Sequence, residues 1–108
     1  MIIVYVTCKD KHEAEKISRI LLEKKLIGCA NIFPIDSMYL WKGKIVRDKE
    51  YAIIAKALMR KHRDIHKEIK KHHSYTIPSI DIIPTKANKE FVRWLKEELR
   101  LKPKQKNI

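Results

Sequence analysis

The chain has 108 residues, which is room for one domain, and 44% of them are hydrophobic, enough for a core that needs neither disulfides nor metal. Its 25 Lys and Arg residues outnumber 13 Asp and Glu, which gives a formal net charge of +12. This charge raises nucleic acid or an acidic membrane as partners, but it also fits the solvated, charge-rich surface of a heat-adapted (thermostable) protein, the interpretation we favour.

Two cysteines, Cys8 and Cys29, are too few for a disulfide framework, so a reducing, intracellular setting is expected. The N-terminal residues, MIIVYVTCKD, lack a basic region, and their apolar run from Met1 to Val6 is too short for a signal peptide or a membrane span. We therefore expect a cytoplasmic protein with no membrane contact, beginning with a strand.

The first elements are a strand and a helix. Residues 2–8 are apolar and rich in β-formers, which predicts a buried strand. Asp10 and Glu13 have the spacing of a capping box, which predicts a helix start. One helical stripe follows, made of Ala14, Ile17, Ile20, Leu21 and Lys24. Gly28 stands just past this helix or at the start of the next strand, where a residue free to take positive φ is useful.

A long hairpin is expected next. Residues 29–41 alternate, so one strand face carries Cys29, Asn31, Phe33, Ile35, Ser37, Tyr39 and Trp41. Pro34 cannot donate to a ladder, so this strand is bulged there or lies at a sheet edge. The pair Lys42-Gly43 predicts a tight turn, and residues 45–58 form the returning strand.

Two helices and a short strand complete the chain. Residues 60–73 have a helical composition, with Ile65 and Ile69 as a thin apolar stripe. Residues 77–83 suggest a short strand bracketed by Pro78 and Pro84. Asn88 is expected to cap a last helix that buries Phe91, Leu95 and Leu99, with Trp94 beside them. Residues 102–108 form a short basic tail without an apolar pattern, which predicts disorder.

The predicted order is β-α-β-β-α-β followed by a helix, which is the α+β, ferredoxin-like arrangement, in a single domain of residues 1–101. Right-handed crossovers would place the helices on one face of a four-stranded antiparallel sheet. The other face would be open, and an open apolar face is usually covered by a ligand, a nucleic acid or another subunit. The long hairpin could also pair with a neighbouring chain by edge addition.

Metal-ligand candidates are few, because the sequence has no CxxC and no zinc-type spacing. Cys8 is expected to be a buried structural thiol, with a copper site shared with His12 as the alternative. Cys29 is either a core thiol or a metal ligand. His62 and His66 are spaced i, i+4 but are more typical of surface residues. His72 and His73 stand near a helix end, where they favour the helix dipole.

The sequence contains no catalytic constellation, so an enzyme is not expected. Ser37, Ser74 and Ser79 lack a nucleophile elbow and an assigned base, and there is no glycine-rich phosphate loop. Tyr39, Trp41 and Trp94 could stack on a base or small ligand, but they are more typical of subunit interfaces.

The segment LIGCANIFPIDSMYLWKGKI, followed by Glu50 and a strand ending IIAKA, resembles the CutA divalent-cation tolerance proteins. The later segments HSYTIPSIDIIP and FVRWL resemble their H-P-Y-x-V-P-E-I and Y-x-x-W patterns, so the likeness runs from Ile2 to about Leu99. It implies a tight homotrimer of ferredoxin-like subunits, built like the nitrogen-regulatory (PII) signalling proteins. It also implies a cytoplasmic role in the response to divalent metals, notably copper.

Carried over to this chain, the resemblance makes Cys29 and His73 the metal candidates, with copper or another divalent metal as a possible ligand that folding does not require. It also implies that five residues line a cleft between subunits: Tyr39, Trp41, Lys56, Tyr75 and Trp94. The chain departs from the family pattern at Ser74, which replaces a proline. Thr76 and Ser79 replace acidic residues, Ala57 replaces a threonine, and Lys86-Ala87-Asn88 replaces a glycine.

Two other functions are compatible with a ferredoxin-like fold. An RNA-recognition or small-ligand module would carry stacking aromatics in its central strands, but residues 52–58 are aliphatic apart from Lys56. A nucleic-acid partner is therefore not expected. An acylphosphatase-like hydrolase would need an arginine and an anion-binding loop after the first strand, where this chain has Lys9 and Lys11.

Overall fold

The computed structural model describes residues 1–100, and it has the α+β architecture expected from the sequence. The elements in chain order are β1 (Ile2–Cys8), α1 (Lys11–Glu23), β2 (Cys29–Trp41), β3 (Lys44–Ala57), a short 3₁₀ turn η1 (Met59–Lys61), α2 (His62–His72), β4 (Ile80–Pro84) and α3 (Lys89–Arg100). The predicted basic tail, residues 102–108, lies outside the described residues.

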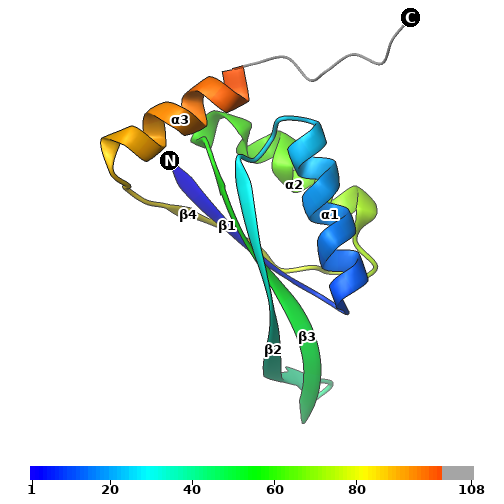
Figure 1. The fold of residues 1–108 in the computed structure, drawn as a ribbon. Coiled ribbons are helices and arrows are strands. Elements are labelled where there is room, and N and C mark those ends of the chain that lie inside the picture. Colours follow the sequence, from blue (N-terminus) through cyan, green and yellow to red (C-terminus); the bar gives the residue numbers. More distant parts are fainter. Residues whose placement is uncertain (101–108) are drawn as a thin grey trace, which may run out of the picture.

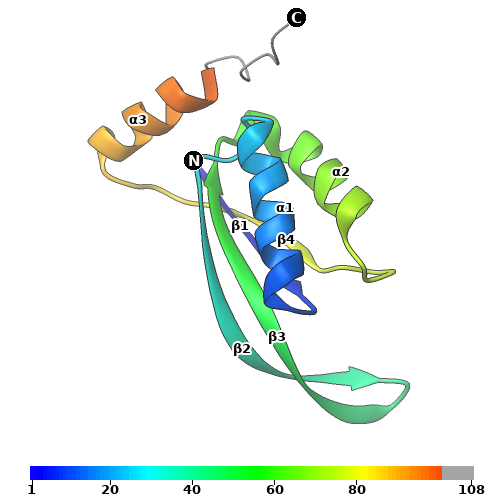
Figure 2. The same ribbon diagram turned by 45° about the vertical axis from the view of Figure 1, so that its right-hand side comes forward.

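The four strands form one sheet in the order β2-β3-β1-β4, and every neighbouring pair is antiparallel. Helices α1 and α2 lie side by side on one face of this sheet, as Figures 1 and 2 show. Helix α3 lies apart from them, across the end of the sheet where the chain starts. The strand order and the one-sided helices are those of the ferredoxin-like fold.

The main core lies between the sheet and the helices α1 and α2. Alternate β1 residues, from Ile2 to Cys8, point toward the helices, and the facing helical residues are Ala14, Ile17, Leu21, Ile65 and Ile69. Burying one Ile or Leu side chain completely stabilises the folded protein by about 1.5–3 kcal/mol relative to leaving that side chain exposed. A second, smaller core under α3 joins Leu58, Leu95 and Leu99 to Met1 and Phe91.

The β2–β3 hairpin is longer than its support from β1. It pairs without interruption from Cys29↔Lys56 to Trp41↔Lys44, whereas β1 stops opposite Tyr51. Residues beyond that point project from the body as a two-stranded arm (Figure 2). The turn has Lys42 at φ 51° and Gly43 at φ 78°, the pair of positive values that a two-residue hairpin turn requires. Pro34 is accommodated because β2 is an edge strand, and the uninterrupted register shows no bulge there.

Two local expectations from the sequence were wrong near α1. Gly28 does not have a positive φ; Lys25, at φ 58°, makes the reversal after the helix. Gly28 is needed for space instead, since a Cβ there would lie 2.2 Å from Leu95 Cδ1. Lys24 is the exposed C-cap of α1 rather than part of its buried stripe, which includes Glu13 and Ser18 instead.

The last strand starts later than expected, whereas the last helix starts directly after Asn88 as expected but with a different side-chain bond there. β4 is Ile80–Pro84 rather than residues 77–83, because residues 73–79 form a loop bonded to side chains and backbone elsewhere. Asn88 precedes α3, but its side-chain amide donates to the Glu90 carboxylate rather than capping the helix through its oxygen.

Candidate functional site

The loop of residues 73–79 is tied to the end of β1 by the imidazole of His73. Its Nε2 lies 2.8 Å from the carbonyl oxygen of Thr7, and its Nδ1 accepts the backbone amide of Tyr75 at 3.0 Å. An Nδ1 that accepts cannot carry the proton, so the proton sits on Nε2 and is donated to Thr7. Both ring nitrogens are therefore occupied within the chain.

Glu13 ties the same loop to the start of α1. One carboxylate oxygen accepts the backbone amide of Lys9 at 3.0 Å, and the other accepts the amide of Ser74 at 2.8 Å. Burial favours the neutral acid, but the hydrogen bonds from Ser74 and Lys9 outweigh it and lower the pKa of Glu13. The carboxylate thus bridges two segments more than sixty residues apart in the sequence.

Cys8 completes a cluster with these two side chains. One potential ligand atom each from Cys8, Glu13 and His73 lies within 4.8 Å of the other two. We call these three residues the clasp cluster. A thiolate, an imidazole and a carboxylate are together a donor set for zinc or another borderline divalent ion.

The present hydrogen bonds oppose metal binding at the clasp cluster. His73 could coordinate through Nδ1 only by releasing the Tyr75 amide. Burial first, and then the Glu13, Glu50 and Asp10 carboxylates, raise the pKa of the Cys8 thiol to about 12, so the thiolate is costly to form. A metal at the clasp cluster would have to displace the proton of the Cys8 thiol and the hydrogen bond between Tyr75 and His73. The three residue types are suitable metal ligands, but their present hydrogen bonds and protonation work against metal binding.

A second buried acid, Glu50, holds the loop from the side of β3. The hydroxyl of Tyr75 donates to its carboxylate at 2.5 Å, and Glu50 is almost fully buried. Burial first, and then this hydrogen bond to a charged acceptor, raise the pKa of Tyr75. Further out on the hairpin, the exposed hydroxyl of Tyr39 makes a longer bond, 3.2 Å, to Asp48.

Different residues gather at the α3 end of the sheet. The ammonium of Lys56 lies 5.0 Å from the centroid of the Phe91 ring, which in turn lies 5.4 Å from that of Trp94. Lys56 pairs in register with Cys29, so the half-buried Cys29 thiol belongs to this end of the sheet. By strand alternation both side chains lie on the face away from α1 and α2.

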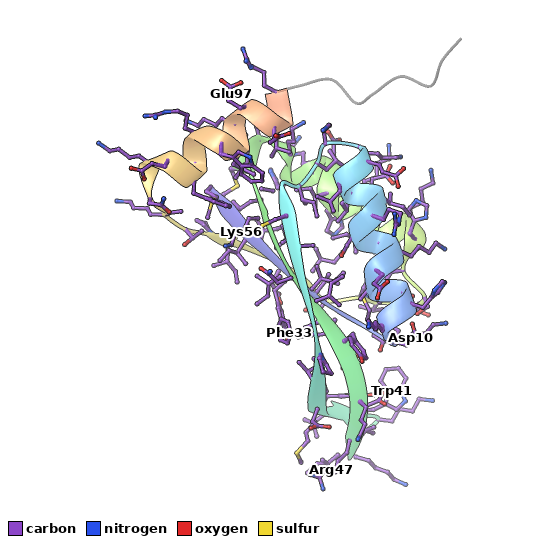
Figure 3. All side chains as sticks on the ribbon, viewed as in Figure 1. Asp10, Phe33, Trp41, Arg47, Lys56 and Glu97 are labelled. Atoms are coloured by element: carbon purple, nitrogen blue, oxygen red, sulfur yellow. The ribbon has the colours of Figure 1, made fainter. Side chains whose placement is uncertain are left out.

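Within one chain, the predicted cleft residues fall in three places. Lys56 and Trp94 are at the α3 end, Tyr75 is at the clasp cluster, and Tyr39 and Trp41 are on the projecting arm. Figure 3 shows Lys56 and Trp41 at opposite ends of the hairpin.

The two predicted metal ligands are also separated. Cys29 pairs with Lys56 of β3, which in turn pairs with Ile3 of β1. His73 contacts Thr7, which lies four residues beyond Ile3 along β1. Four residues of strand correspond to roughly 13 Å. One chain therefore does not bring Cys29 and His73 together.

Sequence reasoning missed the roles of Cys8, Glu13 and Glu50 around this loop. Glu13 was recognised as part of a capping box, and the amide of Glu13 does bond the Asp10 carboxylate at 2.8 Å. Its second role, accepting the backbone amide of Ser74, depends on where residue 74 folds back, which no local pattern encodes.

Two other expectations concern residues away from this loop. His62 bonds the carbonyl of Met59, as expected for a surface histidine. No helix among residues 1–100 is long and apolar enough to cross a membrane.

Comparisons with known proteins cover nearly the whole chain. The family model for the CutA1 divalent ion tolerance protein matches residues 2–98. The divalent-cation tolerance protein CutA of Archaeoglobus fulgidus is 45% identical over 95 residues, which are 87% of this chain and 93% of that protein. The protein of the same name from Thermotoga maritima is 42% identical over 100 residues, 92% of this chain and 99% of that protein.

Solved structures agree with these sequence matches. The structure described as the periplasmic divalent cation tolerance protein CutA from Archaeoglobus fulgidus superposes with a TM-score of 0.89 at 44% identity, covering 92% of this chain and 99% of that one. CutA1 from Pyrococcus horikoshii superposes with a TM-score of 0.87 at 38% identity, covering 91% and 97%. The arrangement of strands and helices seen here is thus shared along almost the full length of these proteins.

Proposed function

Because the chain belongs to the CutA1 divalent ion tolerance family, we propose that it serves divalent-cation tolerance by binding metal as a homotrimer, without catalysis. Its relatives from Archaeoglobus fulgidus and Thermotoga maritima are named divalent-cation tolerance proteins. We further propose copper as the metal, since a thiol is the most distinctive donor that the chain offers.

The observation that carries the metal proposal is the contrast between the two thiols. Cys29 is half-buried on the face that α1 and α2 leave open, whereas Cys8 is fully buried in the core. A thiol that solvent reaches can exchange its proton for a soft metal ion at lower cost than a buried one. Cys29 is therefore the first donor in this proposal, and the hydrogen-bonded clasp cluster is the weaker site.

The separation of Cys29 from His73 makes a second copy of the chain part of the proposal. A site that uses both donors has to combine Cys29 of one chain with His73 of another. The His73 ring would also have to give up one of its two present bonds. A metal bound by Cys29 alone would be weak, so we expect tight binding only in the assembled protein.

Exposed apolar side chains on the projecting arm support the assembly. Leu40 is 74% exposed and Ile45 is 71% exposed, and Met38 and Trp41 are exposed beside them. Side chains of this kind in a row on a two-stranded arm are unusual for a monomer and fit an interface. We propose that the other two subunits cover the projecting arm, and that the trimer works in the cytoplasm.

Native mass spectrometry under reducing conditions, with and without one equivalent of copper(I) per chain, tests the proposal. We expect a trimer that takes up copper stoichiometrically. Cys29→Ala should lose this copper, and the matched variant Cys8→Ala should keep it.

Three results would count against particular parts of the proposal. A monomer at micromolar concentration would contradict the assembly. Copper that is lost in Cys8→Ala and retained in Cys29→Ala would move the site to the clasp cluster. A trimer that takes up no copper would contradict the metal assignment while leaving the fold and the family in place.

A further inference from the structure

Positive charge is concentrated on one segment of the chain, η1 and α2. Between Met59 and His72 there are two acids, Asp64 and Glu68, and six Lys or Arg residues: Arg60, Lys61, Arg63, Lys67, Lys70 and Lys71. The formal charge of this segment is therefore +4, a third of the chain's net +12. By the same count, α1 has three bases and three acids, and α3 has four bases and three acids.

The cations of α2 lie on its outward side. Ile65 and Ile69 are fully buried and fix the inward side of the helix. With 100° per residue, Arg63, Lys67 and Lys71 fall on the opposite side. Lys70 lies next to them, Arg60 continues the row before the helix, and all five are exposed. Figures 1 and 2 show α2 in the outer layer beside α1, so this side faces away from the sheet.

Little negative charge balances this row. Glu68 is already engaged, since one of its oxygens lies 2.7 Å from the Lys24 ammonium of α1 and the other lies 3.3 Å from His72. Within the described residues, Asp64 is thus the acid that remains on the outward side of α2.

The pattern does not stabilise the helix itself. Arg63, Lys67 and Lys71 are like charges at i, i+4 spacing, and each such pair costs a few tenths of a kcal/mol. Arg60 and Lys61 stand at the positive end of the helix dipole. Burial first, and then the neighbouring Arg60, lower the pKa of Lys61, which agrees with crowding of positive charge there.

Acids balance the bases more closely on the other two helices. Lys11 and Glu15 approach to 3.9 Å at i, i+4 on α1, and Arg100 and Glu97 to 2.7 Å on α3. A general heat-adapted surface would alternate charges in this way on α2 as well. α3 also carries Lys89, Arg93 and Lys96 at helical spacing, but three acids on that helix offset them, so η1 and α2 together have the largest net positive charge among the helical segments of residues 1–100.

We propose that this outward face of η1 and α2 binds the phosphate backbone of a nucleic acid without reading its sequence. From Arg60 to Lys71 the row is about 16 Å long, which is enough to contact several successive phosphates. The five side chains of the row include no aromatic that could stack on a base, so the contacts would be electrostatic. This surface lies on the helical side, away from the sheet face considered for RNA above, and it does not depend on the metal proposal.

A nucleic acid fits this face better than an acidic membrane does. A helix that settles on a membrane presents apolar side chains next to its cations, so that they enter the lipid. The isoleucines of α2 are both fully buried under the helix. Met59 of η1, directly before Arg60 in the chain, is a single exposed apolar side chain and does not form an apolar face.

Fluorescence anisotropy with a short labelled DNA duplex of mixed sequence, titrated over a range of salt concentrations, tests the inference. The key variant is Arg63→Glu/Lys67→Glu/Lys71→Glu. The matched control is Lys89→Glu/Arg93→Glu/Lys96→Glu on the exposed side of α3. Both triples change the net charge equally, so they separate a specific face from total charge.

For the unmodified protein we expect binding that weakens steeply with salt, with a slope of log K against log salt of roughly −4. The α2 variant should bind at least about tenfold more weakly, with a slope shallower by roughly 3, since about 0.9 is lost per phosphate contact. The α3 control should stay within about threefold of the unmodified protein, allowing for its lower net charge. Circular dichroism checks folding, and Arg63→Gln/Lys67→Gln/Lys71→Gln replaces the glutamate variant if that one unfolds.

Three outcomes would overturn the inference. One is the absence of salt-dependent binding by the unmodified protein. Another is an equal loss in the α2 and α3 variants, which would assign binding to overall charge. The third is α2-dependent binding to vesicles containing phosphatidylserine that exceeds binding to the duplex, which would make the partner a membrane.

Discussion

Nδ1 of His73 lies 4.0 Å from a Glu13 carboxylate oxygen, but the two side chains do not share a hydrogen bond. Each instead accepts a backbone amide from the same loop: His73 from Tyr75, and Glu13 from Ser74. The loop is therefore fixed by one acceptor of its own, His73, and by one acceptor from α1, Glu13. Its position depends on buried polar side chains rather than on apolar contacts alone.

Replacing Glu13 should weaken the protein more than replacing an exposed acid of the same helix. In Glu13→Gln, an amide group has to face one of two backbone donors, so one hydrogen bond to a charged acceptor is lost in a buried place. We expect a loss of about 1–3 kcal/mol in the free energy of unfolding. Denaturant titration at fixed protein concentration measures it, and Glu15→Gln, on the exposed side of α1, should change stability by less than about 0.5 kcal/mol. Equal effects of the two substitutions would contradict the role given to Glu13.

The same carboxylate predicts a dependence of stability on pH. Folding lowers the pKa of Glu13 from its usual value of 4.5, so the unfolded chain binds a proton more readily than the folded protein does. Its contribution is therefore complete above pH 4.5 and is lost as the pH falls through the folded-state pKa. Unfolding titrations between pH 7 and pH 3 should show a smaller acid loss in Glu13→Gln than in the unmodified protein. Parallel curves would show that other acids account for the loss.

The hydroxyl of Tyr75 should matter more than that of Tyr39, although both donate to acids of β3. Tyr75→Phe leaves the buried Glu50 carboxylate without that donor. This should lower the free energy of unfolding, measured by denaturant titration, by about 1–3 kcal/mol. Tyr39→Phe removes a longer bond on the exposed arm, and water can replace it, so a loss below about 0.5 kcal/mol is expected. The double variant Tyr75→Phe/Glu50→Gln should recover part of the loss, because the unpaired charge is gone. If Tyr75→Phe were as mild as Tyr39→Phe, Glu50 would have to find another donor.

Sequence patterns were sufficient for most of the fold, because those patterns are local. The limits of β1, the capping by Asp10, the Lys42-Gly43 turn and the buried Ile65 and Ile69 each follow from residues within one or two turns of each other. The exception near β4 has a physical cause. Ile77 suggested an earlier start of the strand, but the loop before β4 is held by partners more than twenty residues away.

The candidate site was harder to predict, because its residues meet only after folding. Cys29 and Lys56 were named from the family resemblance, and the register does place them together. Cys8 was correctly expected to be buried, but its neighbours Glu13 and His73 come from two other elements. The sequence could not show that one chain keeps Cys29 and His73 apart, because that depends on which ends of β1 and β2 lie in register.

The close approach of Gly28 to α3 predicts that a larger side chain at this position clashes, although the backbone of Gly28 does not have a positive φ. Gly28→Ala would place a methyl group 2.2 Å from Leu95 Cδ1, and Leu95 is fully buried and cannot swing into solvent. We expect Gly28→Ala to lower the free energy of unfolding by about 1–3 kcal/mol. Gly28→Ala/Leu95→Val, which shortens the opposing side chain, should recover part of it in thermal unfolding experiments. If the double variant were as unstable as the sum of the two single variants, the loss would not come from this contact.

The two cysteines predict a sharp difference in chemical reactivity, which separates exposure from metal chemistry. Alkylation by iodoacetamide requires a thiolate that the reagent can reach. Cys8 is fully buried with a pKa raised to about 12, so it should react only when the protein unfolds, whereas Cys29 is half-buried and should react in the native state. Peptide mass spectrometry after a timed reaction at pH 8, with and without denaturant, measures both sites in one sample. Copper(I) added beforehand should slow the reaction of Cys29 if this thiol binds the metal. Native-state labelling of Cys8 ahead of Cys29 would mean that the end of β1 opens more readily than its packing indicates, and the preference for Cys29 as the metal donor would then lose its basis.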